Sequence, residues 1–463
     1  MTINSLGFIA FVAIAMAIFY LTPGRWRHRV VLPLVSAAFL VLSATSFWGL
    51  IAAVGFVAII VVATGIIARY PRVGVLASTV AGILLVFGWL KGYAMFAWLP
   101  LATQMPPTIG MAYILIRGLQ LLVDMREDRT LRPDALETFS FLTAWPCLVS
   151  GPVQRYQEFA TQAAGMASYR LSDEVLLESL SRMARGWFSV LVLGDVARHL
   201  WLGLKSVAGE GVYPLAFGGS QLAFLVYVYL DFSGYTDIVL GVGHLVGLQL
   251  PENFNRPFEA RSFLEFWGRW HMTMSNWFKT YVYNPVLMQL ASRWPTPATA
   301  NVLASIAFFV TFFLVGMWHG TTWVFAVVGL LLGLGASVNQ WYRGAIRRLL
   351  GKQASARLSA NSVYGMVAKG LTFAYLCGAI IPYGMQGHEM RAVVGRYGIT
   401  GLTISQLLVF LVMAPTSLVH LPTLRGPRSM AGRCLLIALA IVAIEMYTFL
   451  FSAADGRFFY QQY

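Results

Sequence analysis

The chain has 463 residues, of which 58% are hydrophobic and 11% are charged. Soluble domains carry about 25% charged residues, so this composition excludes a soluble protein and predicts a polytopic membrane protein. The formal net charge is +14. In a chain of apolar segments we attribute this charge to membrane topology and to contact with membrane lipid, and we expect no nucleic-acid partner.

Apolar runs of roughly 20 residues, the length of a bilayer-spanning helix, recur from end to end of the chain. In chain order they lie near residues 6–22, 30–47, 49–68, 74–90, 108–123, 136–150, 184–202, 215–230, 236–250, 299–317, 322–341, 363–381, 402–420 and 434–452. Several runs are short, which indicates re-entrant or interfacial segments, so we predict about eleven true spans. The first run lacks the pattern of a cleavable signal peptide and is interpreted as the first span. The predicted fold is all-α, with residues 1–463 forming one integral domain.

Basic residues cluster in segments between the apolar runs, and these segments are predicted loops. The clusters are Arg25, Arg27 and Arg29; Arg69 and Arg72; Arg126, Arg129 and Arg132; Arg343, Arg347, Arg348, Lys352 and Arg357; and Arg425, Arg428 and Arg433. By the positive-inside rule these loops face the cytoplasm. Both termini are then expected on the extracytoplasmic side.

The longest polar segments are 124–137, 154–182, 251–298 and 342–362. Segment 251–298 contains five prolines and must be divided into short helices and turns. Within it, aromatic residues recur at three- and four-residue steps over 261–283, which predicts an amphipathic helix lying partly in the membrane plane.

Two histidines interrupt the apolar pattern: His271 within Phe266–Pro285, and His319 within Met317-Trp-His-Gly320. Ionisable groups at membrane depth are expensive, so they are usually functional. Two histidines without a clear third ligand fall short of a metal site, and no metal is predicted. The three cysteines, Cys147, Cys377 and Cys434, all lie in apolar runs without metal-binding spacing and are predicted to be small buried residues.

Several further motifs precede the histidines in a fixed order. They are Pro107-Thr-Ile-Gly-Met-Ala-Tyr113 with Asp124, Ser150-Gly-Pro-Val-Gln-Arg155, Asp231-Phe-Ser-Gly-Tyr-Thr-Asp237 and Glu252-Asn-Phe-Asn-Arg-Pro257. Over roughly residues 100–340 their order and spacing resemble the membrane-bound O-acyltransferase family. The likeness is greatest to the bacterial branch that contains the alginate O-acetylation and teichoic acid D-alanylation membrane proteins. The C-terminal third departs from the family pattern, with Pro382-Tyr383 where an aromatic-Phe-Arg segment is expected.

The resemblance implies a multi-pass enzyme of the bacterial cytoplasmic (inner) membrane, with its helices around a central funnel or pore. Such an enzyme transfers a small acyl group, here expected to be acetyl. The donor would be a cytoplasmic thioester, either acetyl-CoA or an acyl carrier protein, and no permanently bound cofactor is implied. The acceptor would be a hydroxyl of an extracytoplasmic polysaccharide or of a partner acetyltransferase, as in exopolysaccharide biosynthesis.

His319 is the predicted catalytic base, because neutral imidazole accepts a proton near pH 7 and Gly320 beside it lets a substrate approach the backbone. Trp318 and Trp323 are expected to wall a dry site. The alternative is a structural histidine that a neighbouring helix satisfies, and the resemblance favours catalysis. His271 is the second catalytic candidate, with a role in orienting the donor or His319. It can equally be a helix residue bonded to a backbone carbonyl.

Five further residues are predicted to bind substrate: Trp318, Asn276, Trp270, Asp237 and Arg155. Arg155 follows a Gly-Pro turn and can pair a phosphate or carboxylate, although membrane topology also explains it. Asp237 is one of two carboxylates in an apolar stretch. The simpler interpretation is preferred there: Ser233-Gly234 breaks the helix and Asp237 caps the next one. The acidic residues around the motif are expected to pair with Arg256, Arg261 and Arg269.

Three other functions fit parts of this pattern. A transporter or flippase of an envelope precursor would also have many spans with buried Asp and His, but no two-fold internal repeat is visible. An acyltransferase for lipids or proteins would require an opening to lipid near His319. A non-enzymatic envelope scaffold would tolerate the loss of both histidines.

Overall fold

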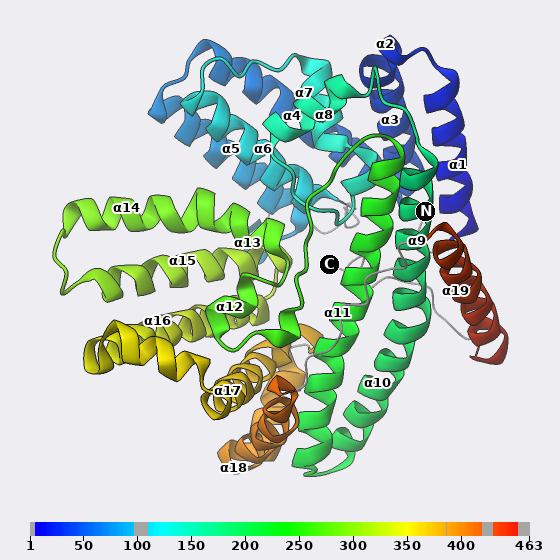
Figure 1. Ribbon diagram of the computed structural model, residues 1–463. Coiled ribbons are helices and arrows are strands. Elements are labelled where there is room, and N and C mark those ends of the chain that lie inside the picture. The colour runs from blue at the N-terminus through cyan, green and yellow to red at the C-terminus, as the bar shows by residue number, and fades with distance from the viewer. Residues whose placement is uncertain (1–4, 97–109, 386, 419–428, 452–463) are drawn as a thin grey trace. The chain divides into compact units, whose positions relative to one another are not determined.

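The computed structural model describes residues 5–96, 110–385, 387–418 and 429–451, and all regular structure in these residues is helical (Figure 1). Internal packing divides the chain into two compact units. The first unit comprises residues 1–192, 231–252 and 426–463, and the second comprises 193–230 and 253–425. The first three residues of the motif Pro107–Tyr113, which are Pro107, Thr108 and Ile109, lie outside the described residues.

The first unit is built from helices at both ends of the chain. Its helices are α1 (Leu6–Leu21), α2 (Gly24–Trp26), α3 (Leu32–Ser43), α4 (Phe47–Arg69), α5 (Val73–Lys91), α6 (Met111–Glu127), α7 (Ala135–Thr143), α8 (Tyr156–Gly165), α9 (Asp173–Phe188) and α19 (Met430–Phe451). A π-helix covers Arg27–Val31, and short 3-10 helices cover Ala94–Phe96 and Trp145–Cys147.

The second unit holds both histidines of interest. Its helices are α10 (Asp195–Glu210), α12 (Phe263–Trp267), α13 (Met272–Phe278), α14 (Asn284–Arg293), α15 (Ala300–His319), α16 (Trp323–Ala360), α17 (Ser362–Ile380) and α18 (Gly387–Met413). One π-helix covers Lys279–Tyr283, and 3-10 helices cover Pro257–Glu259, Ile381–Gly384 and Pro415–Ser417. Another π-helix, Ser189–Gly194, precedes α10 and contributes residues to both units. Helix α11 (Pro214–Leu245) contributes residues to both units.

In the described residues, ten helices are long and apolar enough to cross a membrane. They are Gly24–Ser43, Phe47–Arg69, Val73–Lys91, Asp173–Glu210, Pro214–Leu245, Ala300–His319, Trp323–Ala360, Ser362–Tyr383, Gly387–Ser417 and Met430–Thr448. The apolar helix Leu6–Leu21 is shorter. The predicted all-α polytopic class is therefore confirmed. The basic segment after residue 342, predicted to be a loop, instead continues α16 to Ala360 with a kink at Gly351 (φ 74°), because lysine, arginine and alanine favour helix as strongly as the apolar run before them.

Helix α11 is continuous, so the predicted division into spans 215–230 and 236–250 is wrong. Gly234 does not break the helix; it lets α9 approach. A Cβ on Gly234 would lie 2.7 Å from the carbonyl oxygen of Gly186 on α9, and one on Gly241 would lie 2.8 Å from that of Ser179. Small residues at such crossings let helix backbones approach closely in membranes. Gly234 of this motif and Gly241 one turn beyond it therefore serve helix packing.

Asp237 and Glu252 pair with an arginine that the sequence did not single out. Arg182 on α9 donates from Nε to Asp237 at 2.8 Å and from Nη2 to Glu252 at 2.7 Å. Only 14% of the Arg182 side chain is exposed. The expected partners Arg256, Arg261 and Arg269 are thus wrong for these two carboxylates, and the interpretation of Asp237 as a helix cap is also wrong. The expectation holds for Glu265, which accepts from Arg269 Nη2 at 3.0 Å.

Replacing Arg182 with methionine is expected to lower the melting temperature of the purified protein. The change leaves the carboxylates of Asp237 and Glu252 without their cation, and because both are partly exposed we expect a loss of about 1–2 kcal/mol. Tryptophan fluorescence during heating in detergent measures this. Arg29→Met is the matched control, since Arg29 forms an exposed pair with Asp134 and Glu137 and should change the melting temperature little. Equal shifts in both variants would contradict a structural role for Arg182.

A buried arginine organises the turn before α8. Arg117 on α6 is 1% exposed. Its guanidinium donates to the carbonyl oxygens of Phe141 at 3.3 Å, Cys147 at 3.2 Å and Pro152 at 3.4 Å. Phe141 lies in α7, which has only nine residues, whereas Cys147 and Pro152 belong to the bend after it. The predicted run 136–150 is therefore not one continuous helix, since α7 ends at Thr143 and a 3-10 helix covers Trp145–Cys147.

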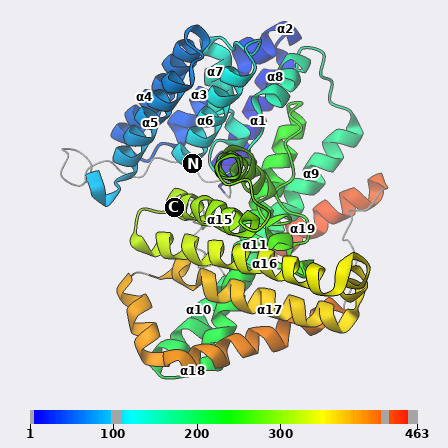
Figure 2. The ribbon, with the colours of Figure 1, turned by 90° about the vertical axis from the view of Figure 1, so that its left-hand side faces the viewer.

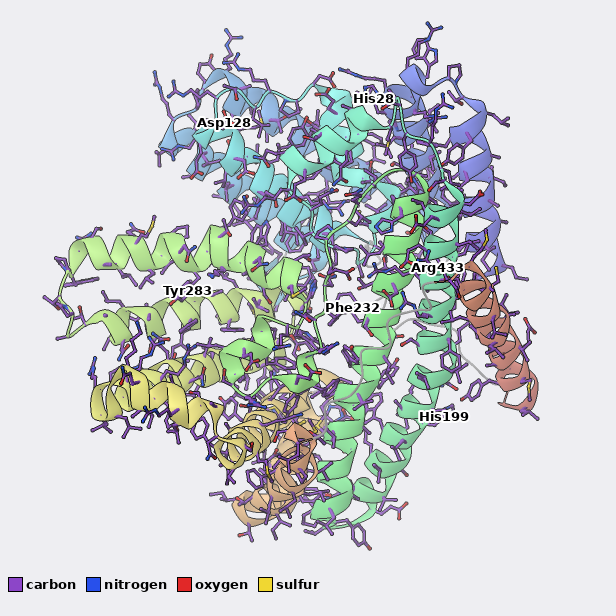
Figure 3. All side chains as sticks on the ribbon, viewed as in Figure 1. His28, Asp128, His199, Phe232, Tyr283 and Arg433 are labelled. Atoms are coloured by element: carbon purple, nitrogen blue, oxygen red, sulfur yellow. The ribbon has the colours of Figure 1, made fainter. Side chains whose placement is uncertain are left out.

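Helices α15 and α16 form the hairpin that presents His319. They are packed so closely that a Cβ on Gly329 would overlap the carbonyl oxygen of Phe312, and one on Gly316 would overlap that of Phe325. Tyr283, labelled in Figure 3, stacks on Phe308 of α15 with ring centroids 4.6 Å apart. Figure 2 shows α15, α16, α17 and α18 one beneath the other. The position of His319 is thus fixed by a layered stack of helices.

One cysteine prediction is wrong. Cys147 and Cys377 are buried as expected, but Cys434 is exposed. It lies on α19, which packs along α9 by one face and leaves the rest of its surface open within the described residues. Hydropathy alone does not distinguish a helix that faces lipid from one that is enclosed by protein, because both are apolar.

Candidate active site

His319 is the last residue of α15, at the point where the helix ends and Gly320 takes an extended conformation. Its side chain is partly exposed. The ring makes an edge-to-face contact with Tyr383, with centroids 5.4 Å apart, and another with Trp318 at 4.8 Å. Aromatic edge contacts of this kind orient a ring. Trp318 and Tyr383 therefore orient the ring of the partly exposed His319.

Gly320 is needed for packing. A Cβ at this position would overlap the ring of Phe325, which itself contacts Tyr383 at 5.4 Å between centroids. Of the two tryptophans expected to wall the site, Trp318 is buried, whereas Trp323 is 47% exposed. The space beside Gly320 that was expected for substrate is filled by a phenylalanine.

His271 is fully buried, and its backbone is left-handed, with φ 42° and ψ 52°. This region is unusual for a residue other than glycine and costs of order 1–3 kcal/mol. It cannot continue a helix, so the predicted helix 261–283 is wrong: the segment divides into α12 and α13 at this residue. After α13 the chain stays helical through Pro285. The π-helix Lys279–Tyr283 leads into α14, and Pro285 stands in the first turn of α14.

Asn253 holds His271 in this conformation. Its side-chain oxygen accepts from the hydroxyl of Thr273 at 2.6 Å and lies 3.2 Å from His271 Nδ1. Its backbone carbonyl accepts from the amide of Met272 at 2.8 Å. The short contact with Thr273 identifies the Asn253 oxygen as the acceptor, which assigns the proton of His271 to Nδ1 and leaves a lone pair on Nε2. His271 is thereby fixed in one tautomer.

Burial lowers the pKa of His271 well below 6.5, and the nearby charge of His319 lowers it further. The structure therefore brings the two predicted histidines close enough to interact electrostatically. At neutral pH His271 is uncharged, so it does not oppose the protonation of His319.

The low pKa of His271 predicts a loss of stability in acid. The unfolded state binds a proton near pH 6.5 and the folded state does not, so stability present above that pH falls as the pH drops through it. We expect the difference in melting temperature between pH 7.5 and pH 5.5 to be smaller in His271→Asn than in the wild type, because the variant lacks the titrating imidazole. Asparagine is chosen because it tolerates the left-handed backbone. His199→Asn is the control, because His199 is exposed. An unchanged difference in His271→Asn would contradict the assignment.

Trp270 lies in an aromatic cluster beside His271. It is 7% exposed, stacks on Phe266 at 5.3 Å, and meets the edge of Phe254 at 5.2 Å. Phe266 in turn contacts Phe373 of α17 at 5.9 Å. The cluster supports the backbone around His271, and the predicted substrate contact of Trp270 stays a prediction.

The other predicted binding residues lie elsewhere. Asn276 is exposed on α13. Asp237 is engaged with Arg182, and Arg155 is exposed at the start of α8; both belong to the first unit. Among the described residues, no group of three His, Cys, Asp or Glu is placed to hold a metal ion. Of the seven predicted residues, five lie in the second unit: His319, His271, Trp318, Trp270 and Asn276.

Sequence reasoning missed three residues around these features. Asn253 was quoted within its motif without a role, and its position beside a buried histidine is visible only in three dimensions. Tyr383 was noted as a departure from the family pattern, and it proves to contact His319. Arg117 carried a usable signal, since an arginine inside the apolar run 108–123 is a costly residue that calls for an explanation.

Comparison with known proteins places the chain in a family. The model of MBOAT, the membrane-bound O-acyltransferase family, matches residues 109–377, which is more than half of the chain. The match includes Asn253, His271 and His319 and ends just before Tyr383.

Curated relatives resemble the chain at modest identity. A teichoic acid D-alanyltransferase of Streptococcus thermophilus is 27% identical over 240 residues, 51% of this chain and 57% of the relative. A probable alginate O-acetylase of Azotobacter vinelandii is 26% identical over 360 residues, 72% of this chain and 67% of the relative. A peptidoglycan O-acetyltransferase of Helicobacter pylori is 29% identical over 211 residues, 45% of this chain and 38% of the relative.

The aligned part spans 57%, 67% and 38% of the length of these three curated relatives. The family match, the order of the motifs and the ten long apolar helices nevertheless agree with one another. This chain is therefore a multi-pass membrane protein that belongs to the membrane-bound O-acyltransferase family.

Proposed function

We propose that this protein is an O-acyltransferase that moves a small acyl group, acetyl, from a thioester donor to a hydroxyl acceptor. The observation that carries the proposal is the partly exposed His319, oriented by Trp318 and Tyr383 beside a buried, neutral His271. The family of the chain and the printed names of its relatives, which include two O-acetyl-transferring proteins, support the reaction class.

In the proposed reaction the acceptor oxygen attacks the thioester carbonyl carbon while His319 accepts the hydroxyl proton. The tetrahedral intermediate then collapses: the carbon–sulfur bond breaks, and the protonated His319 returns the proton to the leaving thiolate. The products are an ester and a free thiol. General-base catalysis of this kind contributes about 10²–10⁴ in rate. The buried His271 does not touch the acceptor and acts as a positioning residue for His319.

The donor is acetyl-CoA or an acyl carrier protein on the cytoplasmic side. The acceptor is a polysaccharide hydroxyl, or a partner protein that passes the group on, on the outer side of the bacterial inner membrane. A funnel through the protein lets the two substrates meet at His319. The charge pattern supports this orientation, since the basic segments are predicted to face the cytoplasm. Arg155 and Asp237 are proposed to contact substrate.

The test uses purified full-length protein in nanodiscs with acetyl-labelled CoA or acetyl-labelled carrier protein, supplied with a polysaccharide acceptor. Label is expected to leave one of the two donors and to appear as an ester on the acceptor or, more slowly, in water as acetate. Transport of an envelope precursor without any loss of label from either donor would support the transporter interpretation. Transfer to lipid or to a protein amine would support the other acyltransferase branches.

A further inference from the structure

The second unit contains a cavity of about 890 Å³ that neither histidine lines. It is lined by residues of α12, α16 and α17, and Figure 2 shows α17 directly beneath α16. Its walls are largely apolar, with Phe263, Leu334 and Leu371 among them, and the ring of Tyr375 packs against Gly335, where a Cβ would lie 2.5 Å from that ring. A cavity of this size accommodates a molecule as large as a typical small-molecule ligand.

The cavity is bordered by side chains that face outward from membrane-spanning helices. Val338 is 58% exposed on α16, and Leu371 is 60% exposed on α17. Both helices are long and apolar enough to cross the bilayer. Large exposed apolar residues on such helices face acyl chains, because no water is present at that depth to favour polar side chains. The cavity therefore opens toward lipid.

One end of the cavity carries two arginines. The Arg261 guanidinium lies 3.3 Å from the position of a Cβ on Gly365, and Arg343 is close enough to Tyr364 to interact electrostatically. Both arginines thus flank the first turn of α17, and both are exposed. Tyr375 lies eleven residues further along this helix, so the apolar part extends about 16 Å from the arginines. This depth is about half of the ~30 Å hydrocarbon core, or one leaflet.

The two arginines have no carboxylate partner in the described part of the chain. The nearest lining carboxylate, Glu265, is bonded to Arg269 at 3.0 Å. A cavity that is apolar over one leaflet and cationic at its rim matches a molecule with an acyl chain and an anionic head. We propose that it binds one anionic phospholipid, with an acyl chain along α16 and α17 and the phosphate between Arg261 and Arg343.

The first test measures lipid binding to delipidated, full-length protein in detergent, by native mass spectrometry. The probes are phosphatidylglycerol and phosphatidylcholine with the same acyl chains, so that only the head-group charge differs. We expect preferential binding of phosphatidylglycerol to the wild type. Equal retention of the two lipids would overturn the proposal. Displacement of phosphatidylglycerol by acetyl-CoA would also overturn it, because the cavity would then belong to the donor.

The second test removes the charges. The double variant Arg261→Gln and Arg343→Gln is expected to bind phosphatidylglycerol roughly thirtyfold more weakly, while phosphatidylcholine binding falls less because choline offsets the charge of its phosphate. The matched control is Arg347→Gln with Arg348→Gln, which removes two charges from the same basic segment of α16 without touching the cavity. Equal weakening in both double variants would show diffuse attraction to the basic segment and would refute the site.

The third test fills the cavity. Val338→Trp places a bulky ring at its border from an exposed position, which does not require the core to rearrange. We expect weaker binding of phosphatidylglycerol than in the wild type. The control Val302→Trp enlarges a valine that is 45% exposed on α15 and outside the lining. Unchanged binding in Val338→Trp would place the lipid elsewhere. None of these readouts depends on acyl transfer, so their failure would leave the proposed function intact.

Discussion

Replacing His319 with alanine is expected to abolish acyl transfer, with a rate at least about a hundredfold below that of the wild type. The variant loses the only group proposed to accept the hydroxyl proton. It keeps the α15–α16 packing, because that contact is made by glycines and backbone carbonyls away from the imidazole. Donor binding should therefore remain. The measurement is the release of label from the thioester donor and its appearance on a hydroxyl acceptor, in nanodiscs.

His388→Ala is the matched control for this variant. His388 is an exposed histidine on α18, in the same unit, and has no part in the proposed reaction. It should retain wild-type transfer. Transfer at the wild-type rate in His319→Ala would remove this residue from the mechanism and would favour a transporter. Loss of donor binding together with transfer would instead assign His319 to the binding of the thioester.

Replacing Gly329 with alanine is expected to lower the melting temperature clearly, by destabilising the hairpin that carries His319. The added methyl group overlaps the carbonyl oxygen of Phe312 and would lie 3.0 Å from the Cα of Phe313, so the helices must separate. Overpacking of this kind costs about 1–3 kcal/mol. Because His319 ends α15, the displacement should also reduce acyl transfer. Heating in detergent with tryptophan fluorescence measures the first effect.

Gly344→Ala on the same helix separates packing from helix propensity. A Cβ on Gly344 would meet the Asn301 amide at 3.4 Å, an ordinary contact. Alanine favours helix over glycine by about 1 kcal/mol, so this control should leave the melting temperature unchanged or raise it. If Gly329→Ala also left the melting temperature unchanged or raised it, helices α15 and α16 would not be packed this closely in the purified protein.

The membrane class was predictable because hydropathy is a property of each segment by itself. The runs near 49–68, 74–90 and 299–317 correspond to α4, α5 and α15 within a few residues. The predictions of helix boundaries were wrong where a residue can have two different effects on the local structure. Ser233-Gly234 can break a helix or permit a close crossing, and only the presence of Gly186 opposite decides between them.

The candidate active site was likewise predictable from the sequence only in part. The sequence by itself determined the polytopic helical class, the order of the family motifs and the two histidines, since each depends on residue type and spacing along the chain. Only the tertiary structure decided that His271 divides a predicted helix, that Asn253 fixes its tautomer, and that Tyr383 contacts His319. These contacts join residues 18 and 64 positions apart. They depend on how helices pack, and a local pattern of hydrophobicity carries no information about which side chain lies across a helix interface.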